Sequence, residues 1–175
     1  MKIVNKISTC LCFDGNAQEA ANFYVSIFKN SKILNTAYYG ESVGKAQGVP
    51  KESILFVTFK LDGQEFLALN GGPSFKFTGA ISLMVACKNQ KEIDYFWEKL
   101  SKGGDKKAQA CGWLKDRFGL SWQIYPSMMI KVFKDKNPEK IDQYMAALMQ
   151  MKKLDIKTLE KAYRSNKNRQ LSHTG

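Results

Sequence analysis

The sequence contains an internal repeat. Residues of the same kind recur at a constant spacing of 73 positions (92 minus 19), in the pairs Glu19 and Glu92, Phe23 and Phe96, and Tyr24 and Trp97. An apolar strand pattern precedes each copy, and a hairpin pattern follows it. Self-similarity of this kind indicates two copies of one supersecondary unit, with insertions placed in loops. We therefore expect each half to read strand, helix, then three strands.

The pattern along the chain predicts where these elements lie. We expect strands over 6–13 and 80–87, and helices over 17–28 and 90–102, the first capped by residues 14–16. Hairpins over 54–69 and 113–125 turn at Asp62-Gly63 and near Phe118-Gly119. These turns are 56 residues apart (119 minus 63), so the first half carries 17 more residues (73 minus 56) between helix and hairpin. In that part of the first half we expect a strand over 32–39 and a long mobile loop over 40–52.

After Pro126 the sequence is helical. We expect helices over 128–133, 139–151 and 156–164, the last capped by Asp155. Methionines and leucine on the second of these helices form an adaptable apolar face that must pack against something.

Composition excludes several classes. An apolar fraction of 44% within 175 residues suits a folded globular chain. No apolar run long enough to span a membrane and no signal peptide is visible, so we expect a cytoplasmic protein with no membrane partner. The net charge of +11 is spread over loops and helices, with its densest excess near the C-terminus. Without a recognisable nucleic-acid-binding motif, this distribution disfavours nucleic acid as a partner.

The four cysteines fit small buried side chains in a reducing compartment, since neither metal-finger spacing nor Cys-x-x-Cys occurs. Cys111 is the exception that we keep as a weak catalytic candidate, because it borders a glycine and opens a hairpin. Tyr125 or Asp116 could assist such a nucleophile in an enzyme that acts without metal.

Several strings together resemble a known family: residues 13–17 (FDGNA), 69–73 (LNGGP), 75–77 (FKF), 111–116 (CGWLKD), 119–124 (GLSWQI) and 151–156 (MKKLDI). They are similar to the PhnB-like proteins, long labelled 3-demethylubiquinone-9 3-methyltransferase domains, of the vicinal oxygen chelate superfamily. This resemblance, over about 7–163, implies an α+β fold of two βαβββ modules whose curled sheets surround a cavity, usually in a homodimer. We expect a glyoxalase-like domain over 1–126 (modules about 5–72 and 79–126), a helical extension over 127–164, and a flexible basic tail over 165–175.

Enzymes of that superfamily hold a divalent metal at four strand positions. The repeat places the equivalents at Thr9 and Ser82 (82 minus 9 is 73), and counting four residues past each hairpin glycine gives Leu67 and Gln123. None of these offers the imidazole, carboxylate or thiolate that divalent metals prefer. The only histidine, His173, lies at the C-terminus. We therefore predict no metal and no cofactor, with Glu65 as an alternative carboxylate ligand if a metalloenzyme site exists.

The resulting prediction is a metal-free protein that binds a small, partly apolar molecule of unknown identity. Alternation predicts that the pocket residues point away from the helix-packing side, which would carry Cys10, Phe66, Leu83 and Trp122. The predicted pocket residues are Thr9, Leu11, Phe13, Leu67, Leu69, Ser82, Met84, Ser121, Gln123 and Tyr125.

Other interpretations remain open. The same side chains could fill a closed core, or the chain could be a lyase, isomerase or dioxygenase of this superfamily. A methyltransferase would need a glycine-rich turn between a strand and a helix, which neither Gly71-Gly72 nor Gly103-Gly104 provides. Open sheet edges and the Met-rich helix predict a homodimer with residues 139–151 at or near the interface.

Overall fold

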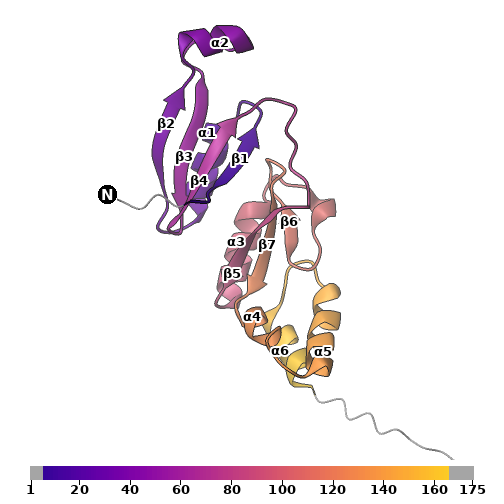
Figure 1. Cartoon of the computed structure of the whole chain (residues 1–175). Helices are drawn as coiled ribbons and strands as arrows, with labels where there is room; N and C mark the ends of the chain where they lie inside the picture. The colour runs from indigo at the N-terminus through magenta and orange to yellow at the C-terminus, as the bar shows by residue number, and fades with distance from the viewer. Residues whose placement is uncertain (1–5, 166–175) are drawn as a thin grey trace, which may run out of the picture. The chain divides into compact units, whose positions relative to one another are not determined.

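The computed structural model describes residues 6–165, in two compact units that divide between Phe77 and Thr78 (Figure 1). Each unit has one β-sheet packed against one main helix, and the C-terminal helices belong to the second unit. The predicted α+β class is confirmed. Within the described range, no helix has the length and apolar character needed to cross a membrane.

The first unit follows the predicted order of strand, helix and three strands. Its elements are β1 (Thr9–Phe13), α1 (Ala17–Ile27), β2 (Lys32–Tyr38), α2 (Glu41–Gln47), β3 (Ile54–Leu61) and β4 (Gln64–Asn70). The sheet has the order β1-β4-β3-β2, in which β1 runs parallel to β4 and the other pairs are antiparallel. Strands β1 and β2 are therefore its two edges.

One face of this sheet is covered by α1. The helix buries Ala20 and Ala21, whose small side chains let the backbone approach the sheet closely. Its Tyr24 ring stacks on Phe59 of β3 at 6.3 Å between ring centroids, and Phe59 stacks on Phe66 of β4 at 5.5 Å. The first core is thus a layer of aromatic and small side chains between α1 and the strands β3 and β4.

The segment predicted as a loop over 40–52 contains the helix α2. Glu41 and Lys45, one helical turn apart, form an ion pair at 3.1 Å. Gly48 follows in the left-handed conformation (φ +65°), where its N–H reaches the carbonyls of Gly44 and Lys45. This is an ordinary helix C-cap. Gly40, Gly44, Lys45 and Gly48 therefore belong to a short helix and its two ends. The prediction of a loop is wrong for residues 41–47.

The start of α1 is capped from a distance and not by its own turn. Asn16 makes no side-chain capping bond; instead the Asn70 side chain accepts a hydrogen bond from Ala17 N at 3.0 Å. The same Asn70 amide donates to the Ile54 carbonyl at 2.8 Å, and its backbone oxygen accepts from the Tyr39 hydroxyl at 3.1 Å. Asn70 therefore joins the end of β4 to the beginnings of α1 and β3.

The second unit has one strand fewer than predicted. It comprises β5 (Ser82–Cys87), α3 (Gln90–Ser101), the short 3-10 helix η1 (Lys106–Ala108), β6 (Trp113–Lys115), β7 (Ser121–Pro126), α4 (Met128–Val132), α5 (Pro138–Met149) and α6 (Ile156–Arg164). The sheet order is β5-β7-β6, with β5 parallel to β7. The shorter insert of this half forms η1 and an isolated bridge between Ala110 and Trp113, where the first half has β2.

The chain beyond α5 returns to the second sheet. Cys111 N donates to the Met151 carbonyl at 2.7 Å, and Gly112 N donates to the Lys152 carbonyl at 2.8 Å. The Gln90 side chain, at the start of α3, donates to the Leu154 carbonyl and accepts from Ile156 N. These bonds fix the segment 151–156 to the sheet and α3, so that the C-terminal helices are an integral part of the second unit.

Candidate functional site

The two faces of the first sheet differ in what covers them. In register, Thr9 lies beside Phe66 and Leu11 beside Ala68, on the face that α1 covers. Leu11 and Phe13 are 4% and 3% exposed. The prediction that Thr9, Leu11 and Phe13 point away from the helix is therefore wrong. Because both faces of this strand carry apolar residues, alternation alone did not identify the core face.

The open face of the first sheet carries the other residues of β1. Cys10 lies beside Leu67 and Cys12 beside Leu69, and all four side chains share the face opposite α1. Leu67 and Leu69 are thus on the predicted face, whereas Cys10 is not on the helix side as expected. The larger apolar side chains, Leu11 and Phe13, were a usable signal, because a core face takes bulkier groups than an open one.

In the second sheet the predicted faces agree with the structure. Ser82 lies in register with Ser121, Met84 with Gln123, and Ala86 with Tyr125. Met84 is 53% exposed, whereas Trp122 and Ile124 of the alternate set are buried on the side of α3. Four predicted residues of this sheet, Ser82, Met84, Gln123 and Tyr125, therefore lie on its open face; Ser121 projects to the same side by alternation but is only 2% exposed. Their role in a pocket stays a prediction.

The polar groups of this open face are joined. The Gln123 amide donates to the Ser82 hydroxyl at 2.8 Å, which links β7 to β5. Trp113 of β6 lies in register with Gln123 and is half-buried, so an indole and an amide are neighbours on the same face. Around them stand Met84 and Tyr125. The arrangement offers a hydroxyl and an amide within an apolar and aromatic surround, which suits a neutral, partly apolar ligand.

The residues do not fit the divalent metal that the fold implies. Thr9 lies on the face covered by α1, and Leu67, Ser82 and Gln123 are neutral side chains. Among residues 6–165, no group of three or more His, Cys, Asp or Glu side chains could hold a metal ion. Glu65, the alternative ligand, forms an ion pair with Lys60 at 3.3 Å. His173 lies outside the described residues. We therefore derive no chemical step through such a metal.

Cys111 has no basic partner among its described contacts. It occupies the left-handed region (φ +54°), and its Sγ lies 3.9 Å from the Met149 carbonyl oxygen, which is not a base. Asp116, proposed as an assistant, is 2% exposed and accepts hydrogen bonds from Phe118 N, Leu120 N and Trp122 Nε1. The carboxylate thus organises the turn between β6 and β7. A catalytic role for Cys111 stays a prediction without support from these contacts.

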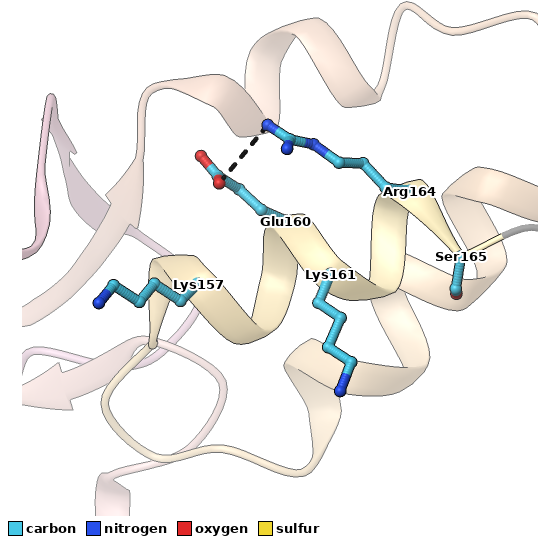
Figure 2. Close-up of a pocket in the computed structure, with 5 residues that line it drawn as sticks. All are labelled: Lys157, Glu160, Lys161, Arg164 and Ser165. Carbon is cyan, nitrogen blue, oxygen red and sulfur yellow. Dashed lines mark ion pairs between the residues drawn. The ribbon is translucent and has the colours of Figure 1, made fainter.

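A shallow depression runs along α6 (Figure 2). Its lining consists of Lys157, Glu160, Lys161, Arg164 and Ser165, and Glu160 pairs with Arg164 at 3.7 Å. All five residues lie on α6 or directly after it, so this depression belongs to one helix and not to either open sheet face. It is distinct from the predicted ligand residues, and its surface resembles any solvated basic helix.

The structure also tests the glycine-rich turns. Residues 71–81, which contain Gly71-Gly72, lead from β4 into β5 without a helix, and Gly103-Gly104 comes after α3. Neither therefore joins a strand to a helix N-terminus, which is the arrangement that binds the cofactor in a Rossmann-type methyltransferase.

Comparisons with family models and with solved structures point to the same family. Residues 5–125 match the family described as 3-demethylubiquinone-9 3-methyltransferase. The solved PhnB protein from Bacillus cereus is 36% identical over 70% of this chain and 99% of that chain, with a TM-score of 0.60. No curated protein matches the chain.

Two more distant structures share the fold alone. Protein PA1353 from Pseudomonas aeruginosa is 19% identical over 70% of this chain and 98% of its own, with a TM-score of 0.54. A mutant form of the fosfomycin resistance protein FosX from Listeria monocytogenes, complexed with Mn(II) and 1S,2S-dihydroxypropylphosphonic acid, is 14% identical over 75% of this chain and all of its own, with a TM-score of 0.53.

Proposed function

Since this chain belongs to the 3-demethylubiquinone-9 3-methyltransferase (PhnB-like) family of the vicinal oxygen chelate superfamily, we propose that it binds a small, partly apolar molecule on its open sheet faces without a divalent metal. The observation that carries the proposal is the open face of the second sheet. There the Ser82 and Gln123 side chains are linked, at two of the strand positions that the resemblance predicts for metal ligands, with Met84, Trp113 and Tyr125 beside them. A few placed polar groups in an apolar surround are typical of a ligand site.

The chemistry of these groups limits the ligand. Ser82 and Gln123 are neutral, so they can donate and accept hydrogen bonds but cannot balance a full ligand charge. Methionine and aromatic side chains around them favour flat or flexible apolar groups. We therefore infer a ligand with an apolar body and one neutral oxygen or nitrogen function that reaches the Ser82–Gln123 pair.

The proposal predicts thermal stabilisation by a ligand and its loss on mutation. In a panel of small, partly apolar alcohols, ketones and amides, a binder present at 100 times its Kd should stabilise the protein by about 2.7 kcal/mol. For a chain of this size that corresponds to roughly 5–10 °C in Tm. Because the polar pair orients the ligand, Gln123→Leu should weaken binding by about tenfold or more, the worth of one hydrogen bond to a buried partner.

The matched control is Lys91→Gln, at an exposed position on α3 that belongs to neither open sheet face; it should leave the ligand-dependent shift in Tm unchanged. Phosphonates belong in the panel as well, because the FosX mutant structure holds one. If only a phosphonate in the presence of Mn(II) raised Tm, or if purified protein carried stoichiometric manganese, zinc, nickel or iron at these positions, the proposal would be wrong.

We also propose that the protein is a homodimer whose interface includes the C-terminal helices. Ile130, Phe133 and Met149 of this region are 49%, 49% and 66% exposed, and large exposed apolar side chains favour a protein partner. Light scattering at micromolar concentration should therefore give twice the chain mass. Met149→Glu should shift the population toward the monomer, whereas Lys136→Glu, at an exposed polar position nearby in sequence, should not. A monomeric wild type would contradict this proposal.

A further inference from the structure

Two thiols stand together on the open face of the first sheet. Cys10 and Cys12 are two residues apart on β1, so both side chains project from the same face, beside Leu67 and Leu69 of β4. Neither is in a disulfide; Cys10 is exposed and Cys12 is half-exposed. Because β1 is an edge strand, this pair is reached from the open face and borders the edge of the sheet.

The spacing of the pair favours an ion between the sulfurs over a bond between them. Residues two apart on a strand have Cα atoms about 6.6 Å apart, near the upper end of the range that a disulfide tolerates. If the zinc–thiolate length of about 2.3 Å is taken as a guide, a two-coordinate ion in line with both sulfurs needs them about 4.6 Å apart. This separation is longer than the roughly 2 Å of a disulfide bond, so parallel side chains on one strand face reach it with less distortion of the backbone.

The surroundings also suit a soft ion. Leu67 and Leu69 supply an apolar border, and thiolate sulfur in such a border selects soft cations such as Cu(I). Cys87 differs, because burial raises its pKa to about 12 and its side chain lies in the core of the second unit.

We propose that Cys10 and Cys12 form a two-thiolate site for one soft monovalent cation of the Cu(I) class. On binding, each thiol releases its proton to solvent and each sulfur forms one bond to the ion, so no electron is transferred. The ligating sulfurs of this site are distinct from Ser82 and Gln123, on which the proposed function rests, and Leu67 only borders the pair. It therefore stands or falls separately from the small-molecule proposal.

The test is anaerobic Cu(I) binding in competition with a chromophoric Cu(I) chelator. The full chain should bind one Cu(I) per chain, and Cys10→Ser and Cys12→Ser should each weaken binding by at least tenfold. Cys111→Ser is the matched control and should bind as the wild type does. One Cu(I) per two chains, an unchanged affinity in either single variant, or no binding by the wild type would each overturn the site.

A second measurement on the unmodified chain guards against a variant that fails to fold. Stoichiometric Cu(I) should protect Cys10 and Cys12 from alkylation by a maleimide while Cys111 reacts at its usual rate, as read by peptide mass spectrometry. X-ray absorption of the complex should show two sulfur neighbours. Equal protection of Cys111, or no protection of Cys10 and Cys12, would contradict the proposal.

Discussion

Gly104→Ala is expected to unfold much of the second unit. A Cβ at this position would lie 2.0 Å from the Lys115 carbonyl oxygen and 3.1 Å from the Asp116 carbonyl carbon, far inside contact distance. Both obstacles are backbone atoms of β6 and the turn that follows, so no side-chain rotation can relieve the overlap. Overpacking costs roughly 1–3 kcal/mol and occasionally more, and a backbone overlap this close belongs at or above about 3 kcal/mol.

Tryptophan fluorescence during urea unfolding is the suitable measurement. All three tryptophans, Trp97, Trp113 and Trp122, lie in the second unit, so the signal reports that unit alone. Gly79→Ala is the matched control, because a Cβ there meets nothing within 4 Å and its φ is not positive. It should change the free energy of unfolding by less than about 0.5 kcal/mol. A Gly104→Ala protein as stable as the control would show that the close approach of residue 104 to β6 is wrong.

Asp116→Ala should cost about 3–5 kcal/mol, the range found when one partner of a buried charged network is removed. The Asp116 side chain is 2% exposed, and its Oδ1 accepts from Phe118 N at 2.8 Å and Leu120 N at 3.1 Å. Its Oδ2 accepts from Trp122 Nε1 at 2.8 Å. Alanine removes this acceptor from three donors at once, in a place where water cannot replace it.

Asp116→Asn distinguishes the contribution of the two turn N–H groups from that of the Trp122 indole. One amide oxygen can still accept from Phe118 N and Leu120 N, but the amide nitrogen would face the Trp122 indole N–H, donor against donor. We therefore expect a smaller loss than for alanine, and most of the loss caused by Asp116→Asn should disappear once Trp122 is replaced by phenylalanine. Asp105→Ala, which only removes the cap of η1 at Lys107 N, should cost about 1 kcal/mol. Equal losses for Asp105→Ala and Asp116→Ala would refute this assignment.

Gly104 and Asp116 matter for the candidate site because they hold in place the strands β6 and β7, which carry its residues. Asp116 fixes the turn that enters β7 and holds the Trp122 indole on the α3 side. Gln123 and Tyr125 are then placed on the opposite, open face by alternation along β7. A variant that loosens this turn should therefore lose ligand-dependent stabilisation as well as stability.

Local signals in the sequence determined much of the architecture. Asp62 and Gly63 both take positive φ (44° and 88°), as their hairpin turn requires, and the hairpin lies where it was predicted. The helix over 156–164 begins and ends at the predicted residues, with Asp155 accepting a hydrogen bond from Thr158 N at 2.8 Å. These features depend on side chains within a few residues of one another. The family resemblance, which rests on local strings, is confirmed for the same reason.

Contacts between distant residues decided the rest. The side chain that caps α1 is Asn70, 53 residues from Ala17, and no local pattern points to it. The strand missing from the second module is replaced by η1 and a bridge, and residues 151–152 return from beyond α5 to bond Cys111 and Gly112. Asp116 was a candidate assistant to a nucleophile from sequence alone; its three donors show that it organises a turn.

The two faces of β1 show most clearly where the sequence determines the structure and where tertiary contacts decide it. The sequence determined that residues 9–13 form a strand with two alternating sets of side chains, because that period follows from backbone geometry. Both sets are apolar enough to be buried, so the sequence did not determine which set meets α1. Only the pairing of Leu11 with Ala68 and Cys10 with Leu67 decided it, because a one-residue change of register exchanges every side chain between core and open face.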